Sequence, residues 1–247
     1  MIDQATCRLL RQYAERYETA EFLNGDPSWW MHQVDGDGNR EATAFVASCL
    51  SYGSRKQFMP KIGQLLDWAG GDMGRWIREG LYEKQLRSGD RQCYYRLYTC
   101  GLMHDFLDAY RRVLDAYGSL GAFVRMNASD GFGAVSAICS FFSQSGISVV
   151  VPKDTTSACK RVCMFLRWMV RDGSPVDLGL WSDFIDRRTL IMPLDTHVVS
   201  QSVRLGLLSS STASMSSARR LTDALAEVFP DDPLRGDFAL FGYGVSK

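Results

Sequence analysis

Apolar residues recur at every third or fourth position along most of this chain, and that period predicts α-helices. Strong examples lie at residues 3–22, 39–53, 54–70, 91–118, 119–126, 131–146 and 157–171. The stretch 91–118 fits one long helix or two helices that join near Gly101. A single strand-like run, at 147–152, ends in a proline, and we predict no sheet from it.

The second half of the chain continues the helical pattern. A short helix is expected near 178–185, another after Pro193, and a third at 217–229 behind a serine-rich loop. We therefore expect an all-α protein of about ten helices. The expected organisation is one globular unit over 1–247, in which 40–172 form a central helical subdomain and 1–39 plus 173–247 form a second.

Composition limits the classes of function. Lys plus Arg and Asp plus Glu number 28 each, so the chain lacks the basic excess that accompanies strong non-specific nucleic-acid binding. The apolar fraction of 46% is enough for a folded core. No run approaches the roughly 18–20 apolar residues of a membrane span, and the charged N-terminal helix is unlike a signal peptide. The 7 cysteines form no C-x-x-C pair, which favours reduced thiols in a cytoplasmic protein.

Basic residues gather on the helix predicted at 157–171. Its core side carries Ala158, Val162, Phe165 and Met169. Its opposite side carries Lys160, Met164, Arg167 and Arg171, flanked by Arg161 and Trp168. Lys160 falls in the first turn, where the positive end of the helix dipole disfavours a cation, and a neutral amine is what nucleophilic catalysis through a Schiff base requires. The alternative interpretation is an ordinary solvated lysine.

Asp195 stands at the start of the helix that follows Pro193. An aspartate there caps the helix, which contributes about 1 kcal/mol, and Gly206 is the matching C-terminal signal. Capping alone is a sufficient explanation of Asp195, and His197 fits a structural hydrogen bonder better than a base. A serine would cap the helix as well but would bring no negative charge.

The segment "MPLDTHV…RLGLL", residues 192–208, resembles the Pro-Val-Asp-Thr-His-Val segment of the helix-hairpin-helix DNA glycosylase superfamily. In that superfamily the aspartate lies at the mouth of the base pocket, and in bifunctional members a lysine on the second helix of the preceding hairpin attacks the sugar. Asp195 and Lys160 occupy the matching positions, and this likeness is specific over residues 157–208. With "CYYRLYT" and "DFALFGYGV", nearly the whole chain resembles a family of bacterial conserved hypothetical proteins that we place near the archaeal 8-oxoguanine glycosylases.

The chain departs from the superfamily pattern in three places. "VPKDTTSA" at 151–158 replaces the Leu-Pro-Gly-Val-Gly hairpin, whose backbone amides normally hold a DNA phosphate. The iron–sulfur cysteines of the endonuclease branch are missing, since no cysteine follows Cys163. "CLSYGSR" lacks the glutamine of the Ser-x-Gln wedge that enters the duplex in many relatives, which leaves Tyr52 and Arg55 as substitutes.

The resemblance implies a glycosylase-like fold of two helical subdomains with a cleft between them. It further implies DNA as the partner and excision of a damaged base, an oxidised purine among the candidates, without cofactor or metal. Lys160 would be the nucleophile and Asp195 its carboxylate. The substrate contacts would come from Tyr52, Arg55, Arg161, Arg167, Trp168, Arg171 and His197. Two alternatives stay open: a non-catalytic member of the fold that binds nucleic acid or protein, and an enzyme that acts on a free nucleoside or base.

Overall fold

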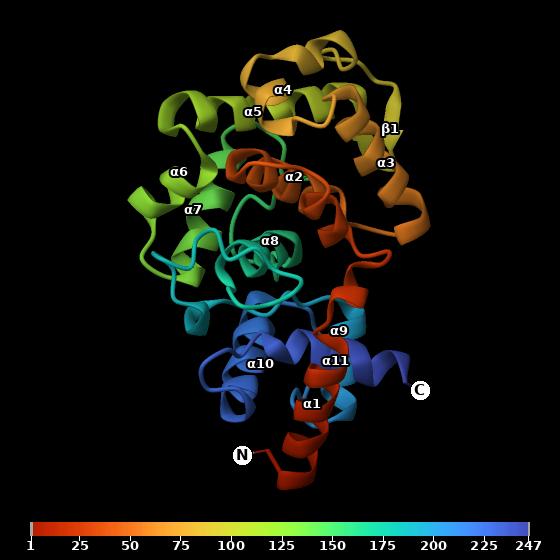
Figure 1. The fold of residues 1–247 in the computed structure, drawn as a ribbon. Helices are drawn as coiled ribbons and strands as arrows, with labels where there is room; N and C mark the ends of the chain where they lie inside the picture. The colour runs from red at the N-terminus through yellow and green to blue at the C-terminus, as the bar shows by residue number, and fades with distance from the viewer. Residues whose placement is uncertain (1, 247) are drawn as a thin grey trace. The chain divides into compact units, whose positions relative to one another are not determined.

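The computed structural model describes residues 2–246, and helices dominate this part of the chain (Figure 1). The all-α prediction is therefore confirmed. The helices are α1 (Gln4–Tyr17), α2 (Asp37–Leu50), α3 (Arg55–Trp68), α4 (Met73–Arg78), α5 (Cys100–Tyr117), α6 (Leu120–Asn127), α7 (Gly131–Ser143), α8 (Lys160–Val170), α9 (Thr196–Arg204), α10 (Met215–Val228) and α11 (Arg235–Val245). Short 3-10 helices cover Ala20–Leu23, Pro27–His32, Leu81–Lys84 and Arg187–Thr189.

A small hairpin replaces the beginning of the helix predicted at 91–118. Strands β1 (Cys93–Tyr95) and β2 (Tyr98–Thr99) pair antiparallel, and α5 starts only at Cys100. The tyrosines hold this backbone extended, because their hydroxyls donate to main-chain carbonyls of distant residues: Tyr94 to Lys61 at 2.5 Å, Tyr95 to Tyr52 at 2.5 Å and Tyr98 to Cys49 at 3.1 Å. The partners come from the C-terminal end of α2, from the loop after it and from α3, so tertiary contacts overrule the helical period.

The helix predicted at 178–185 is absent, and that segment forms turns. Its backbone amides instead donate hydrogen bonds to carbonyls at the end of α8. Leu178 donates to the carbonyl of Trp168 at 2.7 Å, and Trp181 donates to that of Met169 at 2.7 Å. The carbonyls of a helix's last turn lack partners within the helix, and the segment supplies them.

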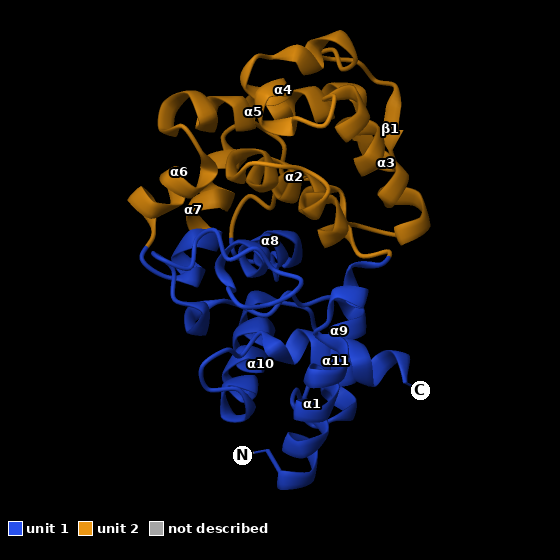
Figure 2. Ribbon diagram, in the orientation of Figure 1, with its two compact units in different colours: residues 1–24, 129–135, 155–247 blue, residues 25–128, 136–154 orange. Residues whose placement is uncertain are grey.

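The chain divides into two compact units (Figure 2). Unit 1 comprises Met1–Asn24, Ser129–Val135 and Thr155–Lys247, and unit 2 comprises Gly25–Ala128 and Ser136–Asp154. The division predicted from the sequence, at 39/40 and 172/173, placed α8 in the central part. In the structure α8 belongs to unit 1 with α1 and α9 to α11, because its arginines are paired there.

Unit 2 is organised around α2, whose residues Glu41–Leu50 are all buried. Helix α2 packs against α3, α4 and the 3-10 helix at Pro27–His32. The carboxylate of Glu41 accepts hydrogen bonds from the amides of Leu120 at 2.8 Å and Gly121 at 3.0 Å, and so caps the beginning of α6.

In unit 1, α11 packs along α1 and α9. Glycines make this approach possible: a Cβ at Gly242 would stand 2.2 Å from the ring of Tyr17, and one at Gly244 would stand 2.3 Å from Nε2 of His197. The sequence "GYG" near the C-terminus is therefore a packing surface for two helices.

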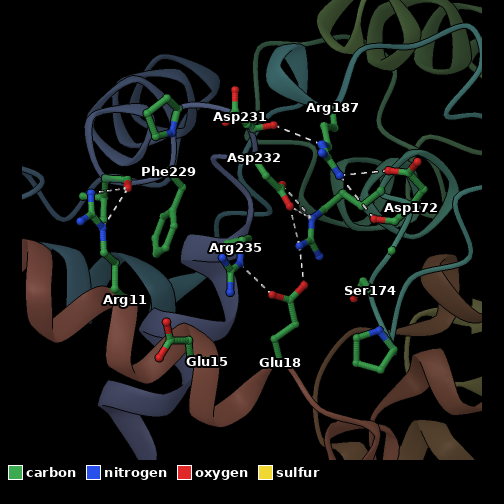
Figure 3. A pocket seen from close by; sticks show the side chains of 15 residues that line it. Arg11, Glu15, Glu18, Asp172, Ser174, Arg187, Phe229, Asp231, Asp232 and Arg235 are labelled. Carbon is green, nitrogen blue, oxygen red and sulfur yellow. Dashed lines mark hydrogen bonds and ion pairs between the residues drawn. The ribbon is translucent and has the colours of Figure 1, made fainter.

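A cluster of buried arginines connects α8 to the rest of unit 1. The side chain of Arg171 is 1% exposed and is paired with Asp177, with Asp232 at 2.7 Å and with Glu18 at 2.5 Å. Arg167, 3% exposed, pairs with Asp177 at 3.2 Å and with Asp237. Glu18, Asp232 and Arg235 line a cavity of about 590 Å³ next to this cluster (Figure 3). Burial alone would lower the pKa of Arg171, but the surrounding carboxylates raise it instead.

Two expectations from composition can be compared with the described part of the chain. No helix within residues 2–246 is long and apolar enough to cross a membrane. No disulfide joins any of the seven cysteines, of which five are buried, Cys7 is half-buried and Cys93 is exposed.

The arginine cluster predicts a large difference between two substitutions. Arg171→Met removes the shared cation and leaves buried carboxylates uncompensated, so the free energy of unfolding should fall by about 3–5 kcal/mol. Arg187→Met breaks an ion pair with Asp172 that is 38% and 61% exposed, and the loss should stay under about 1 kcal/mol. Urea unfolding of the two variants measures both values. Equal losses of unfolding free energy would contradict the assignment of Arg171 as the buried cation that its carboxylates require.

Candidate functional site

Lys160 is the first residue of α8, as the sequence predicted. The preceding residue, Cys159, is buried and has a left-handed backbone with φ of 46°, which is uncommon for a side chain other than glycine. Ser157 forms a β-bridge with Ser214, the N-cap of α10, so the segment before α8 is joined to the beginning of α10. The Lys160 side chain is 32% exposed.

Asp195 is the N-cap of α9, and both oxygens of its carboxylate are engaged. Oδ1 accepts a hydrogen bond from the amide of Val198 at 2.8 Å. Oδ2 lies 3.5 Å from Nζ of Lys160. The other end of α9 closes at Gly206, where φ is +70° and Leu207 donates to the carbonyl of Ser202 at 2.8 Å. Both predicted caps of this helix are confirmed.

The Lys160–Asp195 pair thus joins the beginnings of two helices within unit 1. Both side chains are about one-third exposed, at 32% and 37%, so water and a ligand can reach them. Ion pairs with this exposure contribute little to stability, typically under about 1 kcal/mol. The positive ends of two helices meet here, with the Lys160 ammonium and the Asp195 carboxylate between them.

Asp237, in the first turn of α11, is a second acid of this neighbourhood. Burial raises the pKa of its carboxyl, the ion pair with Arg167 opposes that rise, and the negative charge of Asp195 adds to it. Asp237 therefore lies within electrostatic reach of Asp195. No motif in the sequence singles out Asp237, although a single acid inside the apolar run "GDFALFGYG" is a usable signal.

Three residues predicted to contact substrate are internal instead. Arg167 and Arg171 were expected to hold phosphates, but their guanidinium groups are buried and bound to carboxylates of unit 1. Trp168 was expected to stack on a base, but it is completely buried. The helical period set Arg167 and Arg171 apart from the apolar side, but it could not show that acids from distant segments cover them.

Arg161 follows Lys160 and is half-buried, whereas His197 is exposed in the first turn of α9 and lies against Gly244 of α11. Tyr52 and Arg55 belong to unit 2. Arg55 pairs with Asp26 at 3.3 Å, and Tyr52 packs against the rings of Tyr95 and Tyr98. The structure therefore brings Lys160 together with Asp195, and it places Tyr52 and Arg55 in a different unit.

Metal-binding side chains do not gather in the described chain. Among residues 2–246 no group of three or more His, Cys, Asp or Glu side chains is arranged to hold an ion. The chemistry that this site offers is that of an amine and its neighbouring carboxylates.

The chain belongs to the family described as "Protein of unknown function (DUF2400)", whose model matches residues 26–246. A search of curated proteins and a search of solved structures each gave no match. The family match includes Lys160, Asp195 and Asp237.

The two roles of Asp195 can be separated by substitution. Asp195→Ala removes the cap of α9 and should lower the free energy of unfolding by about 1 kcal/mol, whereas Asp195→Ser keeps a capping oxygen and should stay within about 0.3 kcal/mol of the parent. Chemical denaturation measures both. If the two variants are equally destabilised, the stabilising partner of Asp195 is Lys160 and not the helix.

Asp237 predicts a pH dependence of stability. Because its pKa is raised in the folded protein, the folded state holds this proton more tightly than the unfolded chain does. The stability that the proton contributes is fully present below the ordinary aspartate pKa and is lost as the pH rises from there through the raised pKa of folded Asp237. Asp237→Asn cannot lose a proton there, so its stability relative to the parent should increase over that range. Unfolding at a series of pH values gives the difference in stability between Asp237→Asn and the parent. A decrease in the relative stability of the variant as the pH rises would contradict a raised pKa of Asp237.

Proposed function

We propose that this member of the DUF2400 family is a DNA base-excision glycosylase with lyase activity, in which Lys160 is the nucleophile and Asp195 the assisting carboxylate. The observation that carries the proposal is the 3.5 Å distance between Nζ of Lys160 and Oδ2 of Asp195 in a partly exposed position. The resemblance of residues 157–208 to the helix-hairpin-helix glycosylases supports the same pair.

The pair accounts for the protons of the reaction. Asp195 accepts a proton from the Lys160 ammonium and so produces the neutral amine that attacks C1′ of the nucleotide. The bond from C1′ to the base breaks, its electron pair leaves with the base, and the base takes the proton that Asp195 now carries. The secondary ammonium formed at C1′ carries two protons, and the Asp195 carboxylate accepts one of them. The nitrogen lone pair then forms the C1′=N bond as the bond from C1′ to the ring oxygen breaks, and Asp195 returns its proton to that oxygen, which leaves a protonated imine between Lys160 and C1′.

The negative charge of Asp195 is needed in the bond-breaking step. Cleavage of the glycosidic bond develops positive charge on the sugar, and a carboxylate fixed by its own hydrogen bond to the α9 amide stabilises that charge without reorganising. A serine at 195 would keep the cap and lose this effect. The helix cap thus holds the catalytic carboxylate in place.

The substrate class follows from the resemblance. The archaeal 8-oxoguanine branch makes an oxidised purine in duplex DNA the first base to examine. Residues of unit 1 other than Arg167 and Arg171 would contact the DNA phosphates, because those two arginines are paired with carboxylates of the protein. Arg161, half-buried in the first turn of α8 next to Lys160, is the cation of unit 1 to examine first.

One observation favours a second candidate. Arg167 and Arg171 are paired with carboxylates of the protein, and 28 basic residues balance 28 acidic ones. Both facts favour a ligand that carries few phosphates. An enzyme that uses the same lysine and aspartate on a free nucleoside or base satisfies this condition, as does a non-catalytic binding protein of the same fold.

Borohydride trapping tests the proposal. The protein is incubated with duplexes containing oxidised or deaminated bases, and hydride addition converts the imine to a stable amine that survives denaturing electrophoresis. We expect an adduct with the parent and with Lys153→Gln, a matched control from the exposed loop before α8, and none with Lys160→Gln. Asp195→Ser should trap at least about 100-fold more slowly.

Three results would contradict parts of this proposal. An adduct that persists in Lys160→Gln would show that another residue is the nucleophile. No adduct with any lesion would reject the glycosylase–lyase function. Release of a base from free nucleosides, followed by chromatography in the same set of variants, would then select the small-substrate enzyme.

A further inference from the structure

The cavity of about 590 Å³ in unit 1 is separate from the Lys160–Asp195 pair (Figure 3). All of its lining residues belong to unit 1, and neither Lys160 nor Asp195 is among them. Arg171 lines it just after the last residue of α8, whereas Lys160 is the first residue of that helix, about 15 Å away along the axis. The volume lies in the range of about 300–1,000 Å³ that is typical of small-molecule sites. The cavity is therefore a candidate site for a second ligand.

Two arginines of this cavity are fixed by the protein and keep N–H groups for a ligand. Arg11 donates from Nε and Nη2 to the carbonyl of Val228, at 3.3 and 3.2 Å. Arg187 donates from Nε to the carbonyl of Asp231 at 3.1 Å and from Nη1 to the Asp172 carboxylate at 3.0 Å. Within residues 2–246, Nη1 of Arg11 and Nη2 of Arg187 make no hydrogen bond. A guanidinium held in this way can donate to a phosphate.

Arg235 presents a planar group to the same cavity. Its Nε donates to Glu18 at 2.9 Å, and its guanidinium lies over the buried ring of Phe229, 5.6 Å from the ring centre. The Arg235 side chain is 37% exposed. Bases stack on guanidinium planes as well as on aromatic rings. The cavity therefore has a fixed surface for a flat aromatic ligand.

Two carboxylates of the cavity are available as hydrogen-bond acceptors. Those of Glu15 and Asp231 are exposed, and within residues 2–246 neither accepts a hydrogen bond. The lining as a whole has four arginines and five acids, so a ligand with negative charge alone would not suit it. Carboxylates accept hydrogen bonds from the exocyclic amino group of a base. The lining therefore favours a ligand that combines an anionic group with N–H donors.

We propose that this cavity binds a nucleoside monophosphate whose base carries an exocyclic amino group. The phosphate contacts Arg11 or Arg187, the base stacks on Arg235, and Glu15 or Asp231 accepts hydrogen bonds from the amino group. Such a ligand meets the three properties of the lining at once: fixed cations, a planar support and available carboxylates. Inorganic phosphate would fill only a small part of the volume and would leave the planar support unused.

Calorimetric titration tests the chemical class of the ligand. Adenosine, cytidine and uridine monophosphates, adenosine and inorganic phosphate are each titrated into the parent protein. Cytidine monophosphate should bind about tenfold more tightly than uridine monophosphate, because the two pyrimidines differ in the amino group that a carboxylate recognises. Adenosine and inorganic phosphate should each bind at least about tenfold more weakly than adenosine monophosphate, because each lacks part of the contacts.

Substitutions of arginine locate the site. Arg11→Met or Arg187→Met, whichever removes the phosphate contact, should weaken the binding of adenosine monophosphate at least about tenfold. Arg8→Met and Arg188→Met are the matched controls. They remove exposed arginines that are close in sequence to the first two but do not line the cavity, and both should bind as the parent does.

The outcomes separate this inference from the proposed function. Lys160→Gln should bind adenosine monophosphate as the parent does, and that result supports the inference even if no imine is ever trapped. Loss of binding in Lys160→Gln would place the nucleotide at the Lys160–Asp195 pair and would overturn the inference even if trapping succeeds. Three other results would also overturn it: no binding of any monophosphate, equal affinity for adenosine monophosphate and inorganic phosphate, or unchanged binding in both Arg11→Met and Arg187→Met.

Discussion

The buried charge of Arg171 is the constraint on which unit 1 depends. A guanidinium that is 1% exposed must be neutralised, and its carboxylates come from the end of α1, from the loop after α8 and from the loop before α11. Residues far apart in the sequence are thereby held around the guanidinium group of Arg171. Because Arg171 immediately follows α8, this network fixes the C-terminal end of the helix, and with it the direction from which Lys160 is presented at the other end.

Helix beginnings supply the geometry of the candidate site. Lys160 opens α8 and Asp195 caps α9, so the beginnings of two helices position the two groups. Only two non-glycine residues of the described chain have positive φ, Cys159 and Arg96. Cys159 immediately precedes Lys160. A left-handed backbone at a residue other than glycine persists where the surrounding packing determines it.

Local signals predicted much of the fold. The 3.6-residue period identified α1 to α3, α6 to α8 and α10, and the capping residue Asp195 marked where α9 begins. Two wrong predictions have one cause. At 93–99 and 178–185 the backbone groups are satisfied by distant residues, through tyrosine hydroxyls in the first case and the carbonyls of α8 in the second. Apolar periodicity carries no information about such partners.

The sequence by itself determined that Lys160 would stand in the first turn of a helix and that Asp195 would cap another, because both follow from interactions within a few residues. Only the tertiary structure decided that the two groups lie 3.5 Å apart. It also decided that Arg167 and Arg171 pair with buried acids. In the same way it placed Asp237 where the negative charge of Asp195 raises its pKa. Charge pairing acts through space, and a linear pattern shows which residues carry charge but not which of them meet.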